Sequence, residues 1–326
     1  MKTKRLLLFS AALAVGAFAQ NPQQQNFDNV EIHVLPVQGN IYMLVGAGGN
    51  ITVQAGKDGV LLVDAEYAQL SNKILAAIRT ISDKPLRYIV NTHYHADHTS
   101  GNENLRNAGK SIVGGNFAGD LGGAAATEGA FIIAHFNVLK RMSAPTGSQA
   151  SSPSGGWPTS TYFSDEKKLW FNNEGIEIIH PEHAHTDGDS IVFFRKSDVI
   201  STGDIFTMTS YPIIDLAGGG SYQGLLDAVN KINDLVITVY GQDSGTLIVP
   251  GHGRLCDAGD LINYREMVTI IRDRIVDMIK KGMTMEQVKA ARPTVDYDPL
   301  YGASTVWTPD MFVEAAYKSL SQTMNK

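Results

Sequence analysis

Residues 91–102 have the sequence NTHYHADHTSGN, in which four side chains that bind metal ions fall within six positions. They are His93, His95, Asp97 and His98. In an extended segment, side chains two residues apart point the same way, so the imidazoles of His93 and His95 can reach one ion. Asp97 and His98 follow a turn of the chain, and four ligands from one short loop would crowd a single tetrahedral site. The segment therefore predicts two adjacent metal sites that each need ligands from elsewhere.

The strand predicted at residues 87–90 leads directly into this segment. An earlier buried strand, at residues 60–63, ends at Asp64, and a pattern with helical spacing separates the two strands. A strand that ends at Val90 delivers the histidines into a loop at the carboxyl edge of a sheet, where the catalytic groups of α/β proteins gather. The sequence therefore predicts an α/β fold with the metal sites at a sheet edge.

Three later segments are able to supply the missing ligands. Residues 183–189 read HAHTDGD, residues 201–204 read STGD and residues 250–253 read PGHG. Each lies at the junction of a predicted strand and a loop, with small residues that allow close approach of the backbone. The carboxylate of Asp204 is able to bridge two cations. Nitrogen and oxygen ligands suit zinc, and also iron or manganese.

In this order, HxHxDH, a later His, Gly-Asp and Gly-His-Gly resemble the metallo-β-lactamase-fold hydrolases over roughly residues 30–268. The resemblance implies a four-layered αβ/βα sandwich, with two mixed β-sheets flanked by helices. It implies that the first metal is held by His93, His95 and His185, the second by Asp97, His98 and His252, that Asp204 bridges them, and that Asp64 orients a ligand by hydrogen bonding.

Residues 1–19 have a basic start, an apolar run and the sequence Ala-Phe-Ala, which are typical of a secretory signal peptide. An N-terminal membrane anchor is the alternative, but the apolar run is short for a span. We therefore expect a periplasmic or secreted protein with no stable membrane anchor after cleavage. The segments HTDGDS and TGDIF, with His135 and Asn137, also resemble a periplasmic subgroup of metallohydrolases that includes members linked to quinoprotein systems.

We expect residues 20–326 to form a single domain, with a variable loop near residues 118–161 and C-terminal helices from about residue 258. Residues 143–160 are rich in Ser, Pro and Gly, which indicates a linker or mobile loop. The apolar patterns predict strands at residues 31–35, 41–45, 51–54, 60–63, 87–90, 111–113, 168–171, 176–179, 191–195, 199–201 and 246–249, and helices at 68–81, 102–107, 131–142, 222–236 and 261–281, with a last helix from Thr308-Pro309.

The glycine-rich stretch GAGGN at residues 46–50 has two interpretations. It resembles a phosphate-binding loop, but no helix with Lys-Ser or Lys-Thr follows it. A hairpin turn between two strands is therefore the prediction.

Charge and cysteine content exclude several functions. The formal net charge is −6, and it is more negative without the basic residues of the first 19, so non-specific binding to nucleic acid is not expected. The single cysteine, Cys256, cannot form an internal disulfide or a thiolate-rich metal site. We expect it to be buried and inert.

The ligand set predicts hydrolytic chemistry. Two adjacent cations lower the pKa of a shared water molecule from about 16 to near 7, and the resulting hydroxide attacks a carbonyl or phosphoryl centre. Asp97 is the expected catalytic residue, which takes the proton and passes it to the leaving group. We therefore predict a binuclear hydrolase with two Zn²⁺ per chain that cleaves an ester, lactone, thioester, amide or phosphoester bond in a small molecule.

Two alternatives remain open. Secretion favours a β-lactamase, but the β-lactamases with a cysteine ligand would carry Cys at the position of Asp204. Persulfide dioxygenases share HxHxDH and hold a single iron, so an oxidoreductase of that kind is the second alternative.

The substrate is set by residues 118–161 and 207–221, which carry no specific chemical signature. Within or beside them, His135, Tyr211 and Tyr222 are candidates for contact with substrate, with packing as the alternative role.

Overall fold

A computed structural model describes residues 26–111, 129–144, 152–236 and 245–324. The predicted signal peptide, residues 112–113 of the predicted strand and parts of both predicted loops lie outside the described residues. None of the helices in the described part of the chain is both long and apolar enough to cross a membrane.

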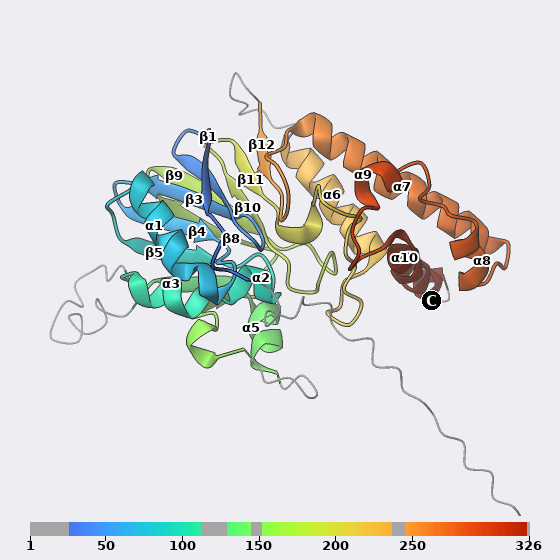
Figure 1. Cartoon of the computed structure of the whole chain (residues 1–326), viewed down its shortest axis with the longest axis horizontal. Coiled ribbons are helices and arrows are strands. Elements are labelled where there is room, and N and C mark those ends of the chain that lie inside the picture. The colour runs from blue at the N-terminus through green and yellow to red at the C-terminus, as the bar shows by residue number, and fades with distance from the viewer. Residues whose placement is uncertain (1–25, 112–128, 145–151, 237–244, 325–326) are drawn as a thin grey trace, which may run out of the picture.

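The first sheet has seven strands in sequence order (Figure 1). The strands are β1 (His33–Gln38), β2 (Ile41–Val45), β3 (Ile51–Gly56), β4 (Gly59–Val63), β5 (Leu86–Val90), β6 (Phe131–His135) and β7 (Ser160–Tyr162). The first four strands pair antiparallel, and β4 to β7 pair parallel. The sheet is therefore mixed, as predicted.

The second sheet has five strands in the order β12-β11-β10-β9-β8. They are β8 (Glu166–Phe171), β9 (Glu174–Ile179), β10 (Ile191–Phe194), β11 (Val199–Ser201) and β12 (Leu247–Val249). Their pairings are antiparallel except for β11 with β12, which is parallel. The loops that follow β11 and β12 consequently leave the same edge of the sheet.

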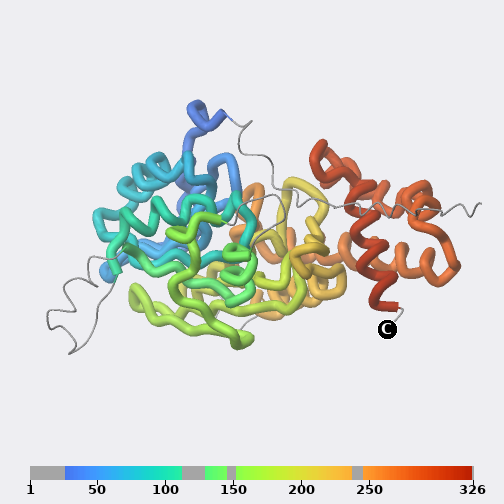
Figure 2. The backbone as a smooth tube through the Cα atoms, turned by 90° about the horizontal axis from the view of Figure 1, so that it is seen from below, coloured from blue at the N-terminus to red at the C-terminus, as the bar shows by residue number. Residues whose placement is uncertain are grey.

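Helices cover the outer faces of both sheets. On the side of the first sheet lie α1 (Ser71–Ile81), α2 (Ala96–Thr99), α3 (Asn102–Ala108) and α5 (Phe136–Ser143), and on the side of the second lie α6 (Tyr222–Val236), α7 (Ala258–Lys280), α8 (Met285–Ala290), α9 (Asp298–Tyr301) and α10 (Pro309–Met324). Figure 2 shows the last helices, in orange and red, gathered at one end of the molecule.

Side-chain alternation along β4 explains the layering. Val60 and Leu62 pack with α1 in one apolar cluster, whereas Leu61 and Val63 pack between the two sheets in another. A strand that is buried on both faces reads as a continuous apolar run, which is why the alternation is not visible in the sequence GVLLV. A third cluster joins the second sheet to α6, α7 and α10. The four layers confirm the predicted αβ/βα sandwich.

The single helix predicted at residues 131–142 is wrong. Residues Phe131–His135 form β6, which pairs with β5 and β7, and the helix α5 begins only at Phe136. The apolar run at the start of this segment suits a central parallel strand as well as a helix, and periodicity alone cannot separate the two. His135 ends the strand, and its Nδ1 accepts a hydrogen bond from the backbone N–H of Asn137 at 3.4 Å.

The glycine-rich stretch at residues 46–50 is the hairpin connection between β2 and β3, which pair antiparallel. This confirms the predicted hairpin turn. Its place in the fold, directly beside His98, is described below.

Candidate metal centre

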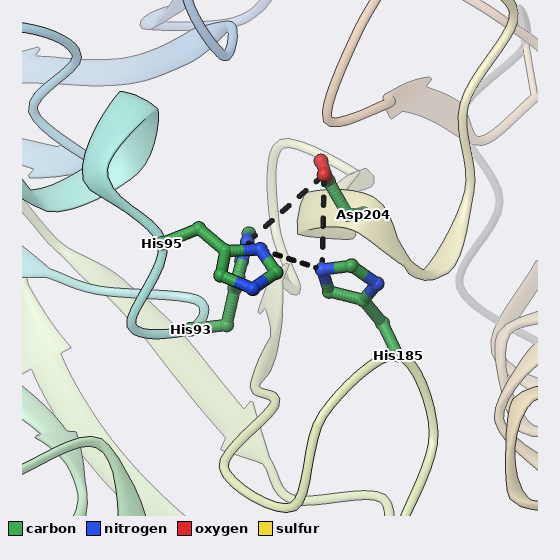
Figure 3. Close-up of side chains that lie close together, drawn as sticks. All are labelled: His93, His95, His185 and Asp204. Atoms are coloured by element: carbon green, nitrogen blue, oxygen red, sulfur yellow. Dashed lines mark hydrogen bonds and ion pairs between the residues drawn. The ribbon is translucent and has the colours of Figure 1, made fainter. Parts of the chain in front are cut away.

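Seven side chains that were predicted from separate motifs meet in two groups. The first group is His93, His95, His185 and Asp204, and the second is Asp97, His98 and His252; within each group the potential ligand atoms all lie within 4.8 Å of one another. Figure 3 shows the first group, with the three imidazoles and the carboxylate turned toward a common point. The four motifs are thus one constellation in space.

Strand ends position these ligands. The histidines of residues 93–98 follow β5, His185 precedes β10, and Asp204 lies in a short 3-10 turn directly after β11. His252 comes from the loop after β12, which is parallel to β11. The centre therefore lies where the two sheets meet, and it draws ligands from both.

Asp204 lies between the two groups. One carboxylate oxygen, Oδ2, is 3.8 Å from His185 Nε2 and 4.0 Å from His93 Nε2. The other, Oδ1, is 3.2 Å from His98 Nε2 and 3.4 Å from His252 Nε2. One oxygen faces each group, which is the placement that a bridging carboxylate requires.

The residues fit metal ions. His95 Nδ1 lies 3.1 Å from His93 Nε2 and 3.0 Å from His185 Nε2, so three ring nitrogens converge. Nitrogens this close need a cation between them, either a proton or a metal ion. Asp204 Oδ1 is also buried, and its near neighbours are the imidazole nitrogens of His98 and His252, so a cation among these three atoms would offset the cost of burying the carboxylate. Imidazole and carboxylate donors are those that divalent zinc, iron and manganese accept.

The outer nitrogen of each of four imidazoles donates away from the centre. His93 Nδ1 contacts Thr92 Oγ1 at 3.0 Å, and His185 Nδ1 donates to the carbonyl of Ile213 at 2.7 Å. The remaining two imidazoles donate to carboxylates, His98 to Asp64 at 2.7 Å and His95 to Asp215 at 3.0 Å. These bonds fix the tautomers so that the inner nitrogens are free to bind metal.

Asp64 lies where its predicted orienting role requires. It is buried and also accepts hydrogen bonds from the backbone and the hydroxyl of Thr92, at 2.8 and 2.7 Å. Its backbone is in the left-handed region, with φ of 68°, which turns the carboxylate back toward His98.

Asp215 was missed by the sequence analysis. Besides His95 Nε2, its carboxylate accepts a hydrogen bond from the hydroxyl of Tyr94 and one from the backbone of Gly218 at 2.7 Å. It lies in a loop of irregular structure, in the sequence YPIIDLAGGG, so no spacing relates it to the histidines. The glycines that follow it are the one local sign of an unusual backbone.

Glycines let two loops approach the ligands. A Cβ at Gly49 would lie 2.2 Å from Cε1 of His98, and one at Gly251 would lie 2.1 Å from Oδ1 of Asp204. Asn50 joins the two loops, because its Nδ2 donates to the carbonyls of Pro250 and Gly253 at 2.9 and 3.0 Å. The hairpin turn that was considered as a phosphate loop therefore supports the second group of ligands.

The imidazoles differ in pKa when no metal is bound. In the first group, burial acts to lower the pKa of His95, but the hydrogen bond to Asp215 outweighs it and raises that pKa. Burial lowers the pKa of His93 well below its ordinary value and that of His185 to about 4. Burial also acts to lower the pKa of His252, but the Asp204 carboxylate outweighs it and raises that pKa to about 10. The same carboxylate raises the pKa of His98 in spite of burial. The second group therefore holds protons that a metal ion must displace.

Two of the residues proposed to contact substrate lie in the core instead. Tyr211 is buried, its ring stacks on Phe312 with centroids 4.8 Å apart, and its hydroxyl donates to Asp298 at 2.9 Å. Tyr222 is buried as well, and its hydroxyl donates to the carbonyl of Val268 at 2.8 Å. Both hydroxyls are satisfied between helices, so the predicted contact with substrate is wrong for both tyrosines.

His135, the third residue predicted to contact substrate, also lies away from the metal groups' cavity. It is buried at the end of β6, and its ring stacks on His180 with centroids 3.7 Å apart. It does not line the cavity over the centre described next.

A cavity of about 890 Å³ opens over the metal groups. His95, Asp97, Asp204 and His252 line one side of it, and residues 303–307 with one face of α10 line another. A pocket of this size is typical of sites for small molecules.

The model of the metallo-beta-lactamase superfamily matches residues 36–116. This match supports the resemblance to the metallo-β-lactamase-fold hydrolases that the ligand motifs carry. It is 24% identical over 276 residues to a linear primary-alkylsulfatase from Pseudomonas sp. (strain ATCC 19151), which covers 74% of this chain and 50% of the relative. The chain thus spans about half the length of the curated relative that it matches.

Two solved structures show the same fold. A stereoselective inverting sec-alkylsulfatase from Pseudomonas sp. matches with a TM-score of 0.64 and 14% identity, over 88% of this chain and 50% of that one. A metallo-beta-lactamase from Pontibacter korlensis matches with a TM-score of 0.53 and 15% identity, over 73% of this chain and 99% of that one. These likenesses establish the arrangement of the sheets and helices that was predicted from the ligand motifs.

The contact between Gly49 and His98 gives a first prediction. Gly49→Ala should displace the His98 imidazole and weaken metal binding by about 10- to 100-fold, the usual cost of disturbing a ligand's support. Metal content per chain after dialysis against a weak chelator measures this.

The matched control is Gly175→Ala on β9, where the nearest atom to an added Cβ is Arg195 Cδ at 3.7 Å. If the two variants retain the same metal content as the unaltered protein, the hairpin does not support the centre.

The raised pKa values of His98 and His252 give a second prediction. Both imidazoles are protonated at neutral pH without metal, so zinc binding should release protons, and apparent affinity should rise with pH up to the His252 pKa of about 10. The rise is about tenfold per pH unit for each proton displaced. Calorimetric titrations with Zn²⁺ in two buffers of different ionisation enthalpy count the protons.

His252→Gln should release about one proton fewer. Affinity that does not change between pH 6 and 8, with no proton release, would show that the second group is not a metal site.

Proposed function

We propose that this protein is a metal-dependent hydrolase with two zinc ions at one centre, acting on a small-molecule substrate. The placement of Asp204, with one oxygen toward each group, is the observation that carries the proposal. The ions would be held by His93, His95 and His185 on one side, by Asp97, His98 and His252 on the other, and by Asp204 between them.

Two divalent cations there would lower the pKa of water and polarise the bond to be cleaved. The residues around them supply position and proton transfer. Asp97 lines the cavity, and interactions with His98 and His252 lower its pKa to about 2 although burial acts to raise it. Its carboxylate is therefore ionised, and its position in the cavity is the basis for proposing that it accepts a proton from water and returns it to the leaving group.

The bond that is cleaved is proposed to be an ester, lactone, thioester, amide or phosphoester bond. Hydrolysis of a sulfate ester is the second candidate, because the alkylsulfatase relative aligns with 74% of this chain. A β-lactamase is less favoured, since the comparison with a metallo-beta-lactamase supports only the fold. The mono-iron dioxygenase is less favoured because the chain offers a second complete group of ligands.

We also propose that the protein acts in the periplasm or outside the cell. The basic start, apolar run and Ala-Phe-Ala of residues 1–19 support this, as typical features of a signal peptide.

The decisive experiment combines metal analysis with a panel of substrates. The panel contains 4-nitrophenyl acetate, S-lactoylglutathione, an acyl-homoserine lactone, bis-4-nitrophenyl phosphate, nitrocefin and dodecyl sulfate, each with zinc and after treatment with a chelator. We expect zinc-dependent turnover of at least one ester and two zinc ions per chain. One iron per chain without hydrolysis would overturn the proposal in favour of the dioxygenase.

Replacement of Asp204 tests the bridging role directly. Asp204→Ala should remove the second metal and lower kcat by about 10³-fold or more, because the two ions act as a unit. The matched control is Asp227→Ala, which removes an exposed carboxylate on α6. Full metal content and activity in Asp204→Ala would refute the binuclear centre.

A further inference from the structure

The wall of the cavity that faces the metal groups comes from the end of the chain. It is built by residues 303–307 and by α10, whose residues Met311, Glu314, Ala315 and Lys318 line the cavity. These four positions follow the spacing of one helix face, while Phe312, Val313 and Ala316 face the core. Helix α10 therefore packs one face on the core and turns another to the cavity, where Met311 and Ala315 are apolar and Glu314 and Lys318 are charged.

We infer that this wall is the binding site for an apolar acyl or alkyl group of the substrate, and the inference rests on the proposed function. Val306, Trp307 and Met311 form its apolar part, and Ile213 and Leu216 face the cavity from the loop that also carries Asp215. The reacting bond would then lie at the metal groups, with the apolar group extending away from them.

The wall has a fixed shape. Trp307 is nearly buried, its indole N–H donates to the carbonyl of Pro212 at 3.2 Å, and its backbone N–H donates to Ser304 Oγ at 3.0 Å. By contrast, Val306 is 50% exposed although it lines the cavity. An apolar ligand would cover Val306 and remove that surface from water.

Charge on the wall disfavours a polyanionic substrate. Lys318 is the one Lys or Arg among the described residues that line the cavity, and its Nζ lies 2.7 Å from Glu314 Oε1. The other oxygen of Glu314 contacts Lys289 Nζ at 3.4 Å. Because Lys318 is already paired, the wall offers no unpaired cation to a phosphate or to a tricarboxylate, and it favours a substrate with one apolar group.

The length dependence of hydrolysis tests the inference. A series of 4-nitrophenyl esters with acetyl, butyryl and octanoyl groups keeps the leaving group constant. We expect kcat/KM to rise by up to about fourfold for each methylene that the wall buries. Val306→Asp should abolish the rise.

The matched control is Leu300→Asp on α9. Leu300 is 72% exposed and does not line the cavity, so this variant should keep the full length dependence. Equal kcat/KM for all three esters in the unaltered protein, or the same slope in Val306→Asp and Leu300→Asp, would overturn the inference.

A binding measurement separates this inference from the proposed hydrolysis. The alcohol 8-bromo-octan-1-ol has no ester bond to hydrolyse, and its bromine quenches tryptophan fluorescence on contact. We expect saturable quenching that disappears in Trp307→Phe and weakens about tenfold or more in Val306→Asp. Quenching without turnover of any ester would refute the hydrolase and keep the apolar site, whereas turnover without quenching would refute the site alone.

Discussion

One buried carboxylate connects both groups of metal ligands. Asp64, at the end of β4, accepts hydrogen bonds from His98 and from the hydroxyl of Thr92, which in turn contacts His93. Asp64 therefore orients His98 of the second group directly and His93 of the first group through Thr92. A buried charge of this kind is stable only when all its partners are in place, so the ends of β4 and β5 are fixed relative to each other.

The sequence was sufficient to predict which candidate ligands come together, and it predicted Asp64 beside them but not Asp215. His93, His185, Asp204 and their partners stand in short motifs at strand ends, so strand prediction alone brings them near one another. Asp215 carries no such spacing, because its contact with His95 depends on a loop path that only the folded chain defines. Tyr211 was a candidate for contact with substrate because nothing in the neighbouring sequence shows that helices cover it in the folded chain.

The same limit applies to secondary structure. The patterns found α6 because its helical periodicity is clear over 15 residues. They failed at residues 131–142, where a short apolar run becomes a central strand only because β5 and β7 lie on either side of it. Neighbours in space decide such segments, and an isolated window of sequence does not contain them.

The centre and the cavity wall are built from separate parts of the chain. The ligands occupy loops at strand ends between His93 and His252, whereas residues 303–307 and α10 form the far wall and contribute none of them. Substitutions on the wall can therefore alter which molecules enter without disturbing the metal ligands. This separation makes the fold evolvable, because a lineage can change its substrate by altering the last helix while it keeps the same reaction chemistry.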